Sequence, residues 1–124
     1  MRSERVVYFT QKEDELANLL MGLGLKRNVA RVLVYLANVH EATSRDIERG
    51  TDLRQPEVSI AMRFLKECDW VESRESKADS KGRPVKIYQL ILPIDSIMDN
   101  IESDKKLEAK NQLDLIQRVR QHIA

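Results

Sequence analysis

The order of hydrophobic periodicities along residues 10–92 is the feature that most constrains the fold of this chain. Apolar residues recur at helical spacing in short segments up to Cys68, and they alternate with polar residues over 85–90. Alternation of this kind is typical of a half-buried strand. Several short helices followed by one hairpin predict a mainly α fold with a small β-hairpin wing (α+β).

Four helices are predicted from these patterns. With their caps they cover residues 10–21, 26–38, 43–50 and 56–68. Thr10 and Glu13 have the spacing of a capping box, so the first helix should begin there. Pro56 suits the first position of the fourth helix, which makes Gln55 its predicted cap. The predicted buried stripe of this helix is Val58, Ala61, Met62 and Leu65.

Two strands and one long helix follow. The strands are predicted at 70–74 and 85–90, with a polar tip between them, while Glu41 and Ala42 are read as a connector. Residues 94–123 read as one long helix, or as two in series with a break near Ser103.

These elements predict two domains with different roles. Residues 1–92 would form a winged helix-turn-helix domain, and residues 93–124 a C-terminal dimerisation helix.

Composition excludes several classes of protein. The 124 residues contain one Cys, so no internal disulfide framework forms, and a reducing, cytoplasmic location is expected. Neither a membrane span nor a secretory signal is readable. The single Cys and two distant His predict no metal site, and without a catalytic motif neither a cofactor nor enzymatic activity is expected.

The distribution of charge is more informative than its total of +1. Residues 54–66 carry a local charge of +2 and residues 76–88 carry +3. The last 35 residues hold six acids and five bases. Positive charge is therefore concentrated in the fourth helix and the hairpin, where it favours contact with a nucleic-acid backbone.

Several segments resemble known transcription regulators. Residues 53–65 (LRQPEVSIAMRFL) resemble the recognition helix of MarR- and ArsR-type regulators. Residues 23–36 resemble the first helix of TrmB-like archaeal regulators, and 70–72 with 82–88 are similar to the wing of the same group. The resemblance covers about 22–92 and implies a homodimeric regulator that binds double-stranded DNA, with an archaeal origin.

The resemblance and the helical wheel together predict the DNA-contacting residues. In the fourth helix they are Gln55, Pro56, Glu57, Ser59, Ile60, Arg63 and Lys66. In the wing they are Lys77, Lys81, Arg83 and Lys86, and at the start of the second helix they are Lys26 and Arg27. Arg83 is the residue expected to enter the minor groove.

Some of these positions admit two interpretations. Glu57 and Ile60 depart from the family pattern. Glu57 would repel phosphate unless it accepts a hydrogen bond from the amino group of a cytosine. Ile60 could touch a thymine methyl group or be buried. Gln55 could read bases or only cap the helix. Arg63 could contact DNA or pair with Glu57 or Glu67.

Dimerisation is predicted from apolar stripes on the first and last helices. The predicted interface residues are Leu16, Leu19, Leu20, Ile97, Ile101, Leu113, Ile116 and Ile123. The last helix could instead fold back on its own domain. The alternative function is a winged-helix module for protein contact without strong DNA binding, and an effector or protein partner stays open in both cases.

Overall fold

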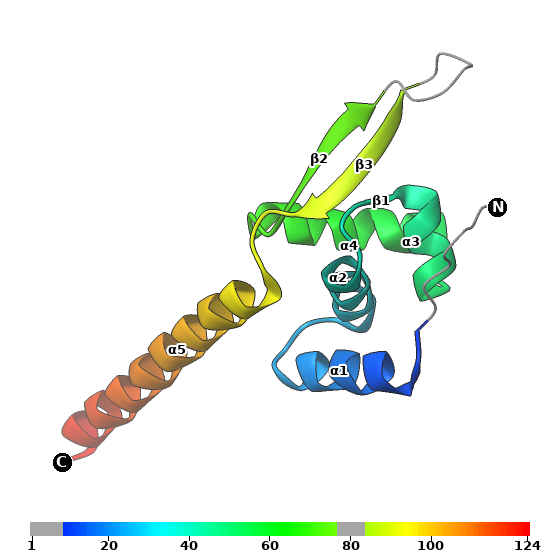
Figure 1. The fold of residues 1–124 in the computed structure, drawn as a ribbon. Helices are drawn as coiled ribbons and strands as arrows, with labels where there is room; N and C mark the ends of the chain where they lie inside the picture. The colour runs from blue at the N-terminus through cyan, green and yellow to red at the C-terminus, as the bar shows by residue number, and fades with distance from the viewer. Residues whose placement is uncertain (1–8, 77–83) are drawn as a thin grey trace. The chain divides into compact units, whose positions relative to one another are not determined.

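The structure is a computed structural model that describes residues 9–76 and 84–124 (Figure 1). Its elements are α1 (Gln11–Gly22), α2 (Arg27–Asn38), β1 (Ala42–Thr43), α3 (Ser44–Thr51), α4 (Gln55–Glu67), β2 (Val71–Ser76), β3 (Val85–Leu90) and α5 (Ile94–Ile123). The fold is mainly α with a small antiparallel sheet, which confirms the predicted fold class. The chain divides into two compact units, Met1–Leu92 and Pro93–Ala124.

Helix α2 is the centre of the first unit. It lies between α1 and α4, and α3 also packs on it (Figure 1). Its residues at helical spacing, Val29, Val32, Leu33 and Leu36, are buried, and so are residues on its other sides. A helix covered on all sides is apolar around its circumference, which explains the many β-branched residues in this segment.

Helix α1 begins after Thr10 as the sequence predicts and ends at Gly22, one residue later than predicted. The Glu13 carboxylate accepts a hydrogen bond from the Thr10 backbone N–H at 2.9 Å. Hydrogen bonds from the Thr10 side chain and backbone lower the pKa of Glu13. Beyond the helix, Gly24 adopts a φ of 110°, a conformation that favours glycine.

The start of α4 corrects the prediction by one residue. The cap is Arg54, and Gln55 is already helical. The Glu57 carboxylate accepts from the Arg54 backbone N–H at 2.8 Å, which fixes the first turn one residue earlier than Pro56 alone suggests. Gln55 is therefore not the helix cap.

The sheet contains a third strand that the sequence does not reveal. Strands are ordered β1-β3-β2, and β1 pairs with β3 through Ala42↔Tyr88 and Thr43↔Ile87. The connector predicted at 41–42 is thus partly wrong, because a two-residue strand is too short to show alternation. Strand β2 begins one residue after Trp70 and runs to Ser76. Trp70 is buried, as is Tyr88 on β3.

Arg31 connects α1, α2 and the end of α3. Its Nε and one terminal nitrogen donate to the Thr51 carbonyl oxygen at 3.2 and 2.9 Å, and its other terminal nitrogen pairs with Asp14 at 3.0 Å. The guanidinium also lies 4.2 Å from the centre of the Phe9 ring. The carbonyl oxygen at the end of α3 thus accepts hydrogen bonds from two nitrogens of one planar guanidinium group.

Replacing Arg31 with lysine should lower the free energy of unfolding by about 1–2 kcal/mol. Lysine keeps the charge near Asp14 but cannot place two donors on one carbonyl oxygen. Urea unfolding of the variant measures the loss. The matched control is Arg49→Lys, since Arg49 is exposed and forms no ion pair within the described chain. Equal stabilities of the two variants would contradict the role of the fork.

Helix α5 is continuous over Ile94–Ile123, so the predicted possibility of a break near Ser103 is wrong. The polar part of the helix carries ion pairs at one-turn spacing. Lys106 lies 3.4 Å from Glu102, Lys105 lies 3.6 Å from Glu108, and Lys110 lies 3.8 Å from Asp114. Such pairs support an exposed helix modestly. Over 9–76 and 84–124, no helix is long and apolar enough to cross a membrane.

Candidate nucleic-acid interface

Helix α4 has one buried face and one exposed face. The predicted stripe of Val58, Ala61, Met62 and Leu65 is buried. The opposite face exposes five of the predicted DNA-contacting residues, namely Gln55, Pro56, Ser59, Ile60 and Arg63. A helix that buries one side in the core can present its other side to the major groove of DNA.

Glu57 has a structural role that explains its departure from the family pattern. Its carboxylate accepts from the Arg54 backbone N–H at 2.8 Å and thereby satisfies one backbone donor at the start of α4. The negative charge stabilises the positive end of the helix dipole. The start of α4 is therefore already occupied by a carboxylate of the chain itself.

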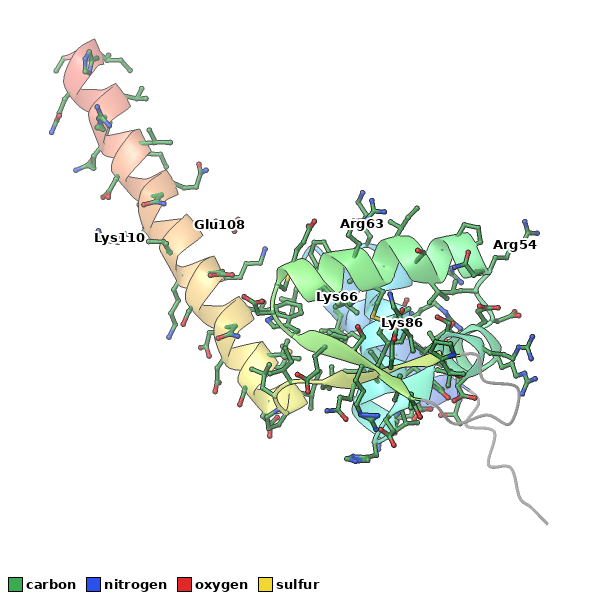
Figure 2. All side chains as sticks on the ribbon, turned by 90° about the horizontal axis from the view of Figure 1, so that it is seen from above. Arg54, Arg63, Lys66, Lys86, Glu108 and Lys110 are labelled. Atoms are coloured by element: carbon green, nitrogen blue, oxygen red, sulfur yellow. The ribbon has the colours of Figure 1, made fainter. Side chains whose placement is uncertain are left out.

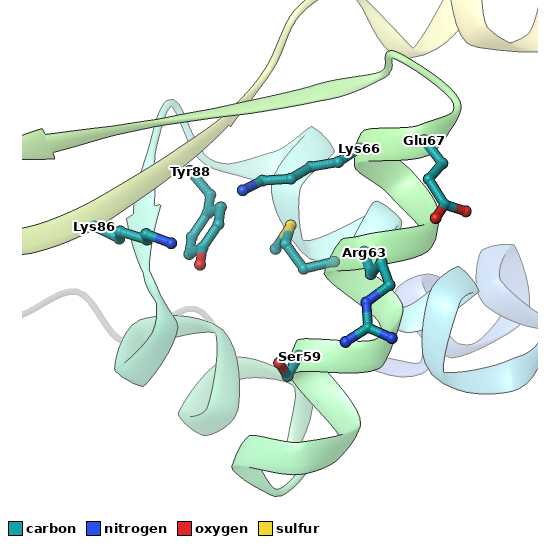
Figure 3. Close-up of a pocket in the computed structure, with 7 residues that line it drawn as sticks. Ser59, Arg63, Lys66, Glu67, Lys86 and Tyr88 are labelled. Carbon is teal, nitrogen blue, oxygen red and sulfur yellow. The ribbon is translucent and has the colours of Figure 1, made fainter.

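An open depression lies between α4 and β3 (Figure 3). Its volume is about 380 Å³. It is lined by Ser59, Met62, Arg63, Lys66 and Glu67 of α4 and by Lys86 and Tyr88 of β3. Lys66 and Lys86 point toward Tyr88 from opposite sides, while Glu67 points away from it (Figure 3).

Tyr88 lies beside two of the cations that line the depression. The Lys66 ammonium lies 5.4 Å from the centre of the Tyr88 ring, a cation–π contact. Lys86 and Tyr88 are two residues apart on β3, so their side chains leave the same face of the strand. The K-x-Y spacing on a predicted strand is the sequence signal that could have placed Tyr88 on the same face as Lys86.

Four cations of this region have no carboxylate partner among the residues that the structure describes. Arg54, Arg63, Lys66 and Lys86 form no ion pair in the described parts of the chain. Arg63 is thus not neutralised by Glu57 or Glu67, which the sequence left open. Arg54 and Arg63 project from α4, and Lys66 and Lys86 lie on its side toward β3 (Figure 2). Positive charge without internal partners is suited to an external polyanion.

The remaining predicted DNA contacts are located elsewhere. Lys26 caps α2 and Arg27 begins it; both are exposed, and neither lines the depression. Lys77, Lys81 and Arg83 fall outside the described residues.

The predicted dimer residues divide into two groups. Leu20, Ile97 and Ile101 are buried. The others remain exposed, namely Leu16 and Leu19 on α1 and Leu113, Ile116 and Ile123 on α5. Leu107, Leu115 and Val119 add to the exposed apolar surface of α5 and were not predicted.

The arrangement of the first unit defines its class. Two short helices, α3 and α4, follow one another across a tight turn in which Asp52 adopts a φ of 60°. The β2–β3 hairpin then packs beside α4. A helix-turn-helix followed by such a hairpin is a winged helix, a fold used by many DNA-binding regulators.

The comparisons with known proteins agree with this class. Residues 23–82 match the model of the MarR family. No curated protein sequence matches the chain. Among solved structures, the archaeal chromatin protein TrmBL2, described as showing a novel mode of DNA binding, is 16% identical with a TM-score of 0.72. That match covers 90% of this chain and 41% of TrmBL2, so this chain spans about two-fifths of that protein.

Two further structures are similar over most of both chains. A possible transcriptional regulator from Methanosarcina mazei Go1 is 16% identical, with a TM-score of 0.60 and coverages of 85% and 88%. MepR, a transcription regulator of a Staphylococcus aureus multidrug efflux pump, is 17% identical, with a TM-score of 0.51 and coverages of 86% and 74%. The chain therefore has the winged-helix fold of the MarR-family transcription regulators, and the predicted resemblance is confirmed.

Proposed function

We propose that this protein is a sequence-specific, DNA-binding transcription regulator that acts as a homodimer. The observation that carries the proposal is a cluster of cations on α4 and β3 that have no carboxylate partner among residues 9–76 and 84–124, namely Arg54, Arg63, Lys66 and Lys86. In this proposal the exposed face of α4 enters the major groove, and the wing, formed by β2, β3 and residues 77–84, contacts the backbone or minor groove. Lys77, Lys81 and Arg83 contribute through the wing.

Selection of bound sequences from random duplex DNA tests this function directly. The expected result is one enriched motif with two-fold symmetry, because a symmetric dimer presents two α4 helices to two half-sites. Absence of any enrichment at moderate salt, with a folded protein, would contradict the proposal.

Dimerisation is proposed through the exposed apolar residues of α5. Leu113 is 64% exposed and Ile116 is 47% exposed, and helical spacing places both on one side with Ile123. Leaving several large apolar side chains in water is unfavourable, whereas a second copy of the helix could cover them. The exposed Leu16 and Leu19 of α1 would extend the same interface.

Changing both Leu113 and Ile116 to Asp should convert the dimer to a monomer. Burying two carboxylates in an apolar interface costs several kcal/mol, which exceeds the margin of a typical dimer at micromolar concentration. Sedimentation velocity measures the change in mass. The control is Asn100→Asp with Asn111→Asp, which adds the same charge on the side of α5 opposite Leu113 and Ile116. An unaltered sedimentation profile for the first variant would remove this surface from the interface.

One observation favours a second candidate, a winged-helix module that binds another protein. Ile60 and Phe64, one turn apart on α4, are 65% and 40% exposed. Exposed apolar side chains are common at protein interfaces. The two candidates differ in salt dependence, since DNA binding through unpaired cations weakens steeply as salt increases and apolar protein contact does not.

A further inference from the structure

Ile60 is an apolar side chain that the fold does not use. It lies in the second turn of α4, between the exposed Ser59 and the buried Ala61, and 65% of its surface is exposed. The core of the first unit is completed by Val58 and Ala61 on the other side of the helix. The sequence left open whether Ile60 is buried, and the structure shows that it is not.

The surroundings of Ile60 favour a polyanion over an apolar partner. Arg63 follows one turn later and Arg54 lies at the helix start; neither has a carboxylate partner within the described chain. An apolar protein surface over Ile60 would have to take these charges out of water, which is costly. Duplex DNA instead places phosphates near the cations and base edges near the centre of the helix.

We propose that Ile60 contacts the 5-methyl group of a thymine in the major groove and is a specificity-determining residue of this protein. The inference rests on the proposed DNA-binding function. The methyl group of thymine is the apolar group that a natural base pair presents in the major groove, and its other edge groups are hydrogen-bond donors and acceptors. The early turns of a recognition helix are the ones that reach base edges, and Ile60 lies in them.

The experiment uses a duplex obtained by selection with the full-length protein. Each thymine is replaced in turn by deoxyuridine, which keeps every hydrogen-bonding group and lacks only the methyl. The expected result is about a fourfold loss of affinity for each methyl that Ile60 contacts, and no loss at other thymines. The Ile60→Ala protein should bind the thymine duplex more weakly and be indifferent to deoxyuridine at the same position.

The matched control is Leu19→Ala, which also truncates an exposed apolar side chain but lies on α1. It should retain the discrimination between thymine and deoxyuridine, and circular dichroism should show both variants folded. A wild-type protein that binds its selected duplex but responds to no thymine methyl would overturn the inference while leaving the proposed function intact. So would an Ile60→Ala variant with unchanged discrimination. Failure to select any duplex would instead refute the proposed function.

Discussion

Replacing Gly50 with alanine is expected to lower the free energy of unfolding by about 3 kcal/mol or more. A Cβ at this position would lie 2.1 Å from Cε1 of Tyr35, and 2.6 and 2.8 Å from two further atoms of the ring. Gly50 and Tyr35 are both buried, so α2 and α3 would have to separate to make room. Interiors packed at native density absorb such an insertion poorly.

Chemical denaturation measures this loss of stability, and Gly22 provides the control because the space around it is open. At Gly22, the last residue of α1, an added Cβ would meet nothing within 4 Å. Gly22→Ala should therefore leave stability unchanged or raise it by up to about 1 kcal/mol, because alanine has the higher helix propensity. Similar effects of the two substitutions would contradict the close approach of α2 and α3.

A double variant separates the clash from other causes. Combining Gly50→Ala with Tyr35→Ala removes the ring that the new Cβ would meet. The cost of the pair should be smaller than the sum of the single costs by more than about 1 kcal/mol. Additive costs would show that Gly50 is required for another reason.

Removing the cations of the depression should weaken DNA binding strongly. The Arg63→Ala, Lys66→Ala and Lys86→Ala triple variant loses three positive charges that have no carboxylate partner in the described chain. Its affinity for the selected duplex should fall by about 100-fold or more at moderate salt. The slope of affinity against salt should fall by about 0.9 for each phosphate contact removed.

Fluorescence anisotropy at several salt concentrations measures both quantities. The matched control removes the same charge elsewhere, by Lys12→Ala, Lys106→Ala and Lys110→Ala. Two of these lysines already form ion pairs on α5, so the control should lose much less affinity. Equal losses in both triple variants would mean that only net charge matters and that the depression is not the interface.

Local patterns were sufficient to predict most elements of the fold. Helical spacing, the Thr10–Glu13 capping box and the alternation over 85–90 each depend on residues within one element, so they are readable without contacts. The errors lie where one element depends on another. Strand β1 has two residues and exists only because β3 pairs with it. The start of α4 is moved by the Glu57 carboxylate, whose partner is a backbone group that Pro56 did not indicate.

The candidate site was predicted in part for the same reason. The exposed face of α4 follows from the wheel, and Lys86 follows from the local charge of the wing. The contact of Lys66 with Tyr88 joins residues 22 positions apart and depends on how the β2–β3 hairpin packs beside α4. The helical wheel places Ile60 opposite the buried stripe of α4, but whether another element covers it there depends on tertiary packing and is visible only in the structure.

By itself the sequence determined the type and order of the elements and the segments in which positive charge is concentrated, because periodicity, capping and composition act over a few residues. Only the tertiary structure decided which cations lack a carboxylate partner within residues 9–76 and 84–124, that Gly50 is held against Tyr35, that Arg31 closes the end of α3 and that Ile60 is exposed. Each of these depends on a distance between side chains from different elements. Such distances are set by packing of the whole domain rather than by local preference.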